Sequence, residues 1–252
     1  MAAAATLRLQ LERSLEARFP AALTPVPRTI REVAATGIAA VDELLDGGFP
    51  VGAISEIVGP VSSGRSSLAL AFLAARTNEE LICAWVDAED AFDPESAAAS
   101  GVRLGQLLWV RCGGGKRKQE KDWARIDQAL RSTDLLLQAG GFAAIMLDLG
   151  GIDPAHGVRI PLATWFRFRQ AADRTRCSLL VLGRASYAQS SAAVVLDAET
   201  MRIESLGGTV LHAGAFALSR RRQRFQPQSF GARKPPASTW TASAQWAMEQ
   251  SA

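Results

Sequence analysis

A short stretch of glycine and small polar residues, residues 59–67, has the composition and spacing of a phosphate-binding loop. It follows an apolar run, residues 53–58, and precedes a helix-like run, residues 68–75. Strand, glycine loop and helix in that order surround one anion with backbone N–H groups and a helix N-terminus. The hydroxyl of Ser66 stands where such loops hold Mg2+. The residues expected around the phosphates are Gly59, Pro60, Ser62, Ser63, Gly64, Arg65, Ser66 and Ser67.

One position departs from the pattern G-x-x-x-x-G-K-[ST], because Arg65 stands where the lysine belongs. Lysine is a compact point charge, whereas arginine is a larger planar fork that keeps its proton. Phosphoryl transfer in such sites relies on the lysine at the β- and γ-phosphates. We therefore expect ATP and Mg2+ as cofactors with weak or lost binding, and inefficient hydrolysis. The alternative is a loop that has kept its shape and lost its ligand.

Two carboxylates are placed to complete such a site. Asp148 ends an apolar run, residues 143–147, and an aspartate in that position holds Mg2+ directly or through water in nucleotide hydrolases. Glu89 follows another apolar run, residues 81–87, and could orient an attacking water as a general base. The alternative role for Glu89 is that of a helix-capping acid.

The elements that must position these groups alternate between short apolar runs and amphipathic runs. Such an alternation indicates a mostly parallel sheet covered by helices on both faces. The predicted fold class is therefore α/β, and ligands are expected at the carboxyl ends of the strands. Strands are predicted at residues 53–58, 81–87, 107–110, 143–148 and 178–183, and helices at residues 36–45, 122–139 and 161–175.

Composition narrows the class of protein. The 252 residues are 48% hydrophobic and 21% charged, which is typical of a globular chain with a buried core. The net charge of +3 permits a polyanionic partner without requiring one. The three cysteines are scattered, which indicates thiols in a reducing compartment and argues against disulfides. The two histidines lie far apart in the sequence, which argues against a zinc site. Without a signal peptide or a membrane-spanning run, a cytoplasmic protein with no membrane partner is expected.

We divide the chain into three parts. Residues 1–32 are predicted to be an N-terminal helix, at residues 6–19, followed by a proline-containing linker, and residues 33–225 form the core domain. The apolar stripe of that helix must be buried against its own domain, a neighbouring subunit or a partner. Residues 226–252 are predicted to be a flexible C-terminal tail.

Aromatic side chains occur in two of these segments. Trp165, Phe166 and Phe168 lie in the helix at residues 161–175 and are expected in the core. Trp240 and Trp246 lie in the tail, where they indicate either a docking motif for another protein or packing on the core. Between core and tail, short strands are expected at residues 193–196, 201–203 and 213–218.

Residues 36–110 resemble the RecA recombinase family. The resemblance implies a RecA-like core with a phosphate loop, in which Glu89 is the catalytic glutamate, Asp93 contacts the adenine and Asp148 positions Mg2+. It also implies that the helix at residues 6–19 docks onto a neighbouring subunit, either a second copy or RecA. The motifs that carry it are Thr36-Gly37, Val41-Asp42, residues 47–52, Glu56 to Gly64, Cys83 to Glu89 and Phe92-Asp93-Pro94.

The chain departs from that family at several functional positions. Arg65 replaces the loop lysine, and Ser96 stands where the family has an adenine-stacking tyrosine. Arg184 and Ala185 stand where the family has an Asn-Gln pair that senses the γ-phosphate. The DNA-binding loops would fall near residues 150–160 and 185–193, and both look shortened. A full strand-exchange recombinase is therefore not expected.

A shortened RecA-like chain with altered ATPase motifs and a long tail is similar to the ImuA family. That similarity implies an accessory role in the DNA damage and SOS responses, namely error-prone translesion synthesis beside an ImuB-like polymerase-related protein and an error-prone polymerase. Clustered arginines suit phosphate contacts with DNA, expected to be single-stranded, although a run of arginines is also typical of a solvated strand end. The residues expected to contact DNA are Arg159, Arg184, Arg220, Arg221, Arg222 and Arg224.

Two other functions remain open from the sequence. The first is a DNA-dependent ATPase of the recombinase type, in which Glu89, Asp148 and Ser66 work despite Arg65. The second is a regulator without catalysis, which caps RecA filaments through residues 6–19.

Overall fold

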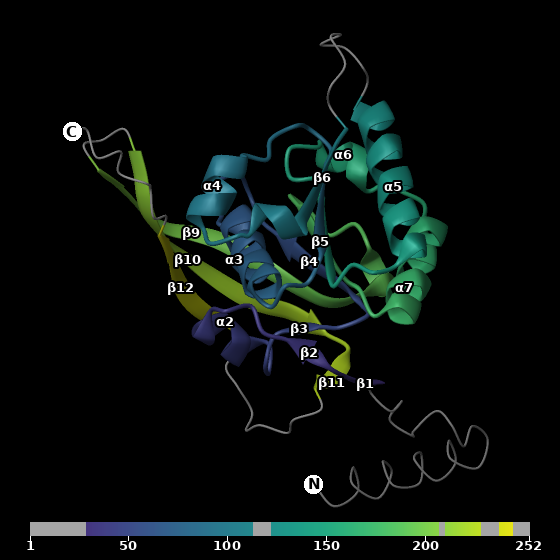
Figure 1. Ribbon diagram of the computed structural model, residues 1–252, viewed down its shortest axis with the longest axis horizontal. Coiled ribbons are helices and arrows are strands. Elements are labelled where there is room, and N and C mark those ends of the chain that lie inside the picture. Colours follow the sequence, from purple (N-terminus) through teal and green to yellow (C-terminus); the bar gives the residue numbers. More distant parts are fainter. Residues whose placement is uncertain (1–28, 113–121, 207–209, 228–236, 244–252) are drawn as a thin grey trace, which may run out of the picture.

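The computed structural model describes residues 29–112, 122–206, 210–227 and 237–243, and an eight-stranded sheet runs through its centre (Figure 1). Every neighbouring pair from β9 to β6 is parallel, and β10 and β12 extend the sheet antiparallel to their neighbours. The predicted α/β class with a mostly parallel sheet is confirmed. In spatial order the strands are β12 (Ala237–Ser243), β10 (Val210–Gln223), β9 (Ala192–Leu206), β4 (Ile54–Val58), β8 (Ser178–Gly183), β7 (Ala144–Asp148), β5 (Cys83–Asp87) and β6 (Leu107–Arg111).

Helices cover both faces of the sheet. The helices α2 (Ala39–Leu44), α3 (Arg65–Asn78) and α4 (Pro94–Ala99) lie on one face, and α5 (Asp122–Ala139) and α7 (Leu162–Thr175) lie on the other (Figure 1). Every residue of β4, β5 and β8 is buried, as expected for parallel strands with helices on both sides. Two hydrophobic clusters result, one around Phe72 of α3 and one around Trp165 of α7.

The parallel register brings four chain segments to one edge of the sheet. Val58 of β4 pairs with Gly183 of β8, and Asp87 of β5 pairs with Asp148 of β7. The loops that leave these residues therefore meet at the carboxyl ends of the strands, where α/β sheets bind ligands.

Short strands and helical segments lie around the central sheet. The strand β1 (Thr29–Arg31) pairs in parallel with β11 (Phe225–Pro227), and β2 (Val33–Ala34) pairs with β3 (Phe49–Pro50). The helix α6 (Pro154–Gly157) and the 3-10 turns η1 (Leu104–Gln106) and η2 (Gln189–Ser191) lie in the connections. Within the described residues, no helix has the length and apolar character needed to cross a bilayer.

The C-terminal part of the chain differs from the expectation. The three short strands predicted near residues 193–218 are two long strands, β9 and β10, which pair as an antiparallel hairpin. Residues 237–243, expected in a flexible tail, form β12 at the edge of the sheet. The physical reason is the burial of Trp240, which is 5% exposed and packs against Phe216 with ring centroids 5.1 Å apart.

Two local predictions are also corrected. The helix predicted at residues 36–45 begins at Ala39. The residues before it form a turn, in which the hydroxyl of Thr36 accepts the N–H of Ile38 and the backbone N–H of Thr36 donates to the Asp42 carboxylate. In α7, Trp165 and Phe168 are buried as predicted, whereas Phe166 is 47% exposed. Consecutive helical residues are about 100° apart, so one of three neighbouring aromatic side chains falls on the outer face.

The predicted limits of the three parts stay predictions. The predicted linker ends in β1, where Arg31 donates to the carbonyl of Gly52 and forms an ion pair with Asp173. The predicted N-terminal helix at residues 6–19 and Trp246 lie outside the described residues.

Candidate nucleotide site

The loop at residues 59–64 connects β4 to α3 and has the shape that its sequence predicts. Gly64 precedes the helix in the left-handed region, with φ of 84°. A side chain there would also meet the ring of Phe216 at 2.6 Å, so position 64 requires glycine for two reasons. The first N–H groups of α3 have no acceptor within the helix and are available to an anion.

A cavity of about 170 Å³ opens beside this loop. Serine and glycine residues of the loop line it together with the ring of Phe216. The side-chain oxygen of Ser63 is buried without a hydrogen-bond partner among the described residues. A buried hydroxyl is usually hydrogen-bonded, so this oxygen stands out within the phosphate loop. The residues that line the cavity are Ser62, Ser63, Gly64, Arg65, Ser66, Ser67 and Phe216.

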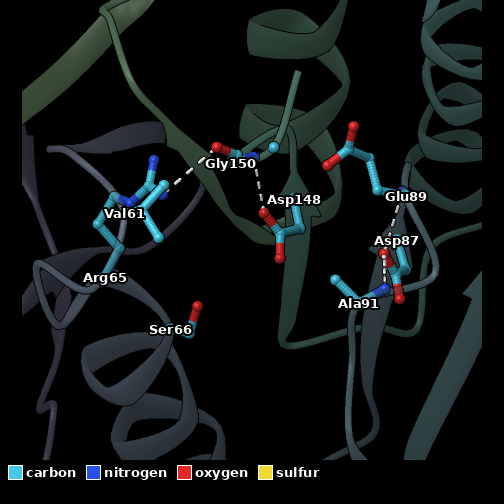
Figure 2. Close-up of a pocket in the computed structure, with 9 residues that line it drawn as sticks. Val61, Arg65, Ser66, Asp87, Glu89, Ala91, Asp148 and Gly150 are labelled. Atoms are coloured by element: carbon cyan, nitrogen blue, oxygen red, sulfur yellow. Dashed lines mark hydrogen bonds between the residues drawn. The ribbon is translucent and has the colours of Figure 1, made fainter. Parts of the chain in front are cut away.

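The side chain of Arg65 leaves the first turn of α3 and reaches toward the loop after β7 (Figure 2). Its Nη2 donates to the carbonyl oxygen of Gly150 at 3.4 Å, and the Nε of Arg184 donates to the same oxygen at 3.1 Å. Arg65 is 9% exposed, and its Nη1 has no partner among the described residues. Burial lowers the pKa of the Arg65 guanidinium, because removal from water disfavours the charged form.

Asp148 ends β7 close to the guanidinium of Arg65. Its Oδ1 accepts the N–H of Gly150 at 2.8 Å (Figure 2). Burial raises the pKa of the Asp148 carboxyl to about 6, against the opposing effects of the Gly150 N–H and of Arg65. The carboxylate is therefore held close to the arginine cation without a direct ion pair between them among the described residues.

Glu89 faces a second cavity of about 170 Å³, which lies between the phosphate loop and the carboxyl ends of β5 and β7. Its carboxylate occupies the space that a side chain on Gly151 would fill, so a larger residue at position 151 would displace Glu89 from its present position. Arg65, Ser66 and Asp148 line the same cavity, as Figure 2 shows. The structure thus brings together the side chains that the sequence analysis assigned to Mg2+, to the phosphates and to the general base.

The turn that carries Glu89 is held by Asp87, which the sequence analysis did not single out. The Asp87 carboxylate accepts the backbone N–H groups of Glu89, Ala91 and Phe92 at 3.2, 3.1 and 2.8 Å. It also accepts the indole N–H of Trp109 at 3.3 Å. The signal available in the sequence was an aspartate that ends an apolar strand two residues before Glu89.

Asp93 does not line either cavity. It caps α4, where it accepts the N–H groups of Glu95 and Ser96 and the hydroxyl of Ser96. The Ser96 hydroxyl lowers the pKa of the Asp93 carboxyl. Because Asp93 holds the capping position of this helix, the alternative role of Glu89 as its cap is wrong. The adenine contact predicted for Asp93 stays a prediction.

The arginines predicted to contact DNA do not form one cluster. Arg184 lies in the site, and Arg159 is exposed after α6. Arg220 donates to the carbonyl of Leu44 at 2.8 Å and pairs with Asp46 at 3.0 Å. Alternating residues of β10 face opposite sides of the sheet, which separates the members of this run. Arg221 binds Asp197 with two nitrogens, Arg222 lies 4.0 Å from Glu56, and Arg224 donates to the carbonyl of Ser190 at 2.9 Å.

Glu56 fixes the second of the two predicted DNA-binding loops. It lies in the buried strand β4, and its carboxylate accepts the N–H groups of Tyr187 and Ala188 at 2.6 and 2.8 Å. The hydroxyl of Ser186 also donates to it, at 2.5 Å. The connection between β8 and β9 is therefore tied to the sheet. An acidic residue inside an otherwise apolar strand was the sequence signal for this role.

Among the described residues, no three histidine, cysteine, aspartate or glutamate side chains come together as a metal site. Ser66 and Asp148 line one cavity and fit Mg2+ in the way of nucleotide sites, where few protein ligands and the substrate's phosphates share the ion.

Comparison with known proteins places this site in a family. Residues 23–150 match the model of the RecA N-terminal domain. Protein RecA of Ectopseudomonas oleovorans is 38% identical over 118 residues, which cover 46% of this chain and 31% of that protein. Protein RecA of Rickettsia canadensis is 34% identical over 140 residues, covering 55% of this chain and 38% of that protein. The chain thus matches about a third of the length of these relatives.

A solved structure shows the same fold over a longer part of the chain. The RadB recombinase aligns with a TM-score of 0.57 over 83% of this chain and 94% of that chain, at 18% identity. Identity this low shows the fold alone. The family assignment rests on the matching domain model, which spans the phosphate loop, Glu89 and Asp148. By that match, the chain belongs to the RecA family through its RecA N-terminal domain.

Proposed function

We propose that this chain is a RecA-like DNA-binding accessory protein of the DNA damage response, with weak or absent ATP hydrolysis. The single observation that carries the proposal is the hydrogen bond from Arg65 to the carbonyl of Gly150. The cation of the phosphate loop is engaged within the protein, on the far side of the cavity from the loop backbone. A lysine at this position would present a point charge to the β- and γ-phosphates instead.

The phosphate loop keeps the features that favour an anion. Its glycine geometry, the N-terminus of a 14-residue helix and the hydroxyl of Ser66 favour ATP with Mg2+ as the ligand. Efficient hydrolysis needs charge aimed at the γ-phosphate in advance. Arg65 would have to release Gly150 before it could supply that charge, which supports slow turnover.

The DNA-binding part of the proposal is supported by family membership and by arginines on the surface. Arg159 and Arg184 are exposed near the edge of the sheet where the site lies. The proposed context is error-prone translesion synthesis in the SOS response, beside an ImuB-like polymerase-related protein and an error-prone polymerase in the cytoplasm. The N-terminal helix and the last residues of the chain are the proposed contacts with these partners, with RecA or with a second copy.

The experiment that tests this function measures binding and turnover on one sample. Binding of a fluorescent single-stranded oligonucleotide and release of phosphate from ATP with Mg2+ are measured on the full chain. We expect salt-sensitive DNA binding, because arginine–phosphate contacts release counterions, together with phosphate release near background. The same two measurements are made on Arg65→Lys. Its matched control is Arg103→Lys, on an exposed side chain remote from the cavity. DNA binding that is absent at low salt would contradict the proposal.

A second function is favoured by one specific observation. Glu89 faces the cavity that Ser66 and Asp148 also line, as a general base in a DNA-dependent ATPase of the recombinase type would. In that case single-stranded DNA should stimulate phosphate release, and Glu89→Gln should abolish it. Release at the background level with and without DNA would eliminate this alternative.

A further inference from the structure

The outer side of α7 carries a line of exposed side chains that the core does not use. Leu162, Phe166, Gln170 and Arg174 recur at every fourth residue, and all four are exposed. At 1.5 Å per residue this line is about 18 Å long. Arg169 lies beside it, with its guanidinium 4.9 Å from the centre of the Phe166 ring. We call these five residues the α7 face.

Phe166 is the distinctive residue of this face. Its neighbours Trp165 and Phe168 are fully buried and fill the space between α7 and the sheet. The packing of α7 is therefore complete without the Phe166 ring, which remains 47% exposed beside Leu162 at 52%. An exposed aromatic ring next to an arginine is a surface on which a planar group can stack.

The charges around the α7 face are arranged to attract an anion. In the parts of the chain that the structure describes, Arg159, Arg169 and Arg174 have no carboxylate partner, and Arg174 binds the amide oxygen of Gln138. The nearby carboxylates are already paired, because Asp173 binds Arg31 at 2.8 Å and Asp134 binds Arg167 at 3.1 Å. The remaining guanidinium groups can donate to phosphate oxygens.

A groove continues the line from Phe166 toward the end of the helix. It has a volume of about 360 Å³, and the side chains that line it include Arg167, Gln170, Asp173 and Arg174 from α7 and Gln138 from α5. A chain-like ligand would thus meet a stacking site first and next a groove in which Arg174 has no carboxylate partner among the described residues. The length of this track fits a polymer better than a compact small molecule.

We propose that the α7 face binds single-stranded nucleic acid, with an unpaired base stacked at Phe166 and backbone phosphates on Arg169 and Arg174. The inference rests on the proposed DNA-binding function and assigns it to a surface. An apolar docking site for a protein would use Leu162 and Phe166 as anchors without needing unpaired cations. Arg169 and Arg174, neither of which has a carboxylate partner among the described residues, favour a polyanion, and the exposed ring favours one with free bases.

The test separates stacking from general apolar contact. Affinity for a labelled oligo-dT is measured by fluorescence anisotropy on the full chain at several salt concentrations. Phe166→Leu should weaken binding by roughly fivefold to a hundredfold, because base–aromatic stacking is lost, whereas Phe166→Tyr should retain it. Arg169→Ala and Arg174→Ala should each reduce the salt slope of log K by about 0.7. Leu104→Ala and Arg103→Ala, on side chains that lie beyond α3 and α4 on the other face of the sheet, are the matched controls.

The outcomes distinguish this inference from the function on which it rests. If the wild type binds oligo-dT but Phe166→Leu and the two arginine variants bind equally well, the α7 face is not the site, and DNA binding lies elsewhere. If Phe166→Tyr weakens binding as much as Phe166→Leu with unchanged circular dichroism, base stacking at Phe166 is refuted. If the wild type does not bind at all, the proposed function fails together with the inference.

Discussion

The guanidinium of Arg65 and the carbonyl of Gly150 are joined by a hydrogen bond of 3.4 Å across the candidate site. It links the phosphate loop to the turn that follows Asp148. Arg184 donates to the same oxygen from the end of β8, so the turn is held by two cations. The position of this turn is thereby coupled to the residue type at position 65.

Trp240 tests whether the C-terminal strand belongs to the core. Trp240→Ala should lower the free energy of unfolding by about 3 kcal/mol, because a buried indole that packs on Phe216 is removed. Thr241→Ala, on the exposed neighbour, should change it by less than about 0.5 kcal/mol. Urea denaturation followed by circular dichroism measures both. Equal, near-zero effects of the two substitutions would mean that residues 237–243 are a flexible tail after all.

Glu56 should stabilise the connection between β8 and β9. Glu56→Gln keeps the oxygen that accepts the N–H groups of Tyr187 and Ala188, but it replaces Oε2, which accepts the Ser186 hydroxyl and lies 4.0 Å from Arg222, with an NH2 donor and removes the negative charge. We expect a loss of roughly 2 kcal/mol in the free energy of unfolding, since buried donors would lack a charged acceptor. Glu43→Gln, on an exposed side chain, is the control and should be near neutral. A loss no greater than that of the control would show that the connection does not depend on Glu56.

Asp148 gives a prediction for the dependence of stability on pH. Burial raises the pKa of its carboxyl from 3.8 to about 6, so the folded state binds the proton more tightly than the unfolded state. This group therefore stabilises the fold at low pH, and its contribution declines as the pH rises from about 4 to about 6. Asp148→Asn keeps an acceptor for the Gly150 N–H and removes the titration. The stability of Asp148→Asn relative to wild type should rise by roughly 3 kcal/mol over that interval and stay level above it.

The measurement is urea denaturation of both proteins at pH 4, 5, 6 and 7 in one buffer series. Subtracting the two curves removes the other titrating groups, including Asp90 and Asp93, whose pKa values are lowered by hydrogen bonds and whose effect has the opposite sign. A constant difference across this range would refute a buried, titrating Asp148.

The site could be predicted from the sequence where its parts are local. The phosphate loop, its strand and its helix are contiguous, and apolar strands that end in Asp87 and Asp148 must meet at one sheet edge if the sheet is parallel. Glu89 follows one of these strands by two residues, so its place in the cavity follows from the same argument. The RecA-like core was therefore predictable in outline.

The features that the sequence did not predict depend on contacts between residues far apart in the chain. Arg220 to Arg224 look like one basic run, but their partners Leu44, Asp46 and Asp197 come from other elements. The direction of Arg65 depends on Gly150, 85 residues later, so no local pattern could predict it. Trp240 looks exposed in a polar segment, and only pairing with β10 brings it onto Phe216.

The central claim is that Arg65 donates to the carbonyl of Gly150 and therefore contributes little to nucleotide binding. Calorimetric titration of the full chain with ATP and Mg2+, on wild type and on Arg65→Lys, tests it most directly. The account predicts weak or undetectable binding to wild type and a gain of at least tenfold in affinity for Arg65→Lys, since a lysine would present its charge to the phosphates. Tight binding to wild type, with equal or weaker binding to Arg65→Lys, would contradict the account.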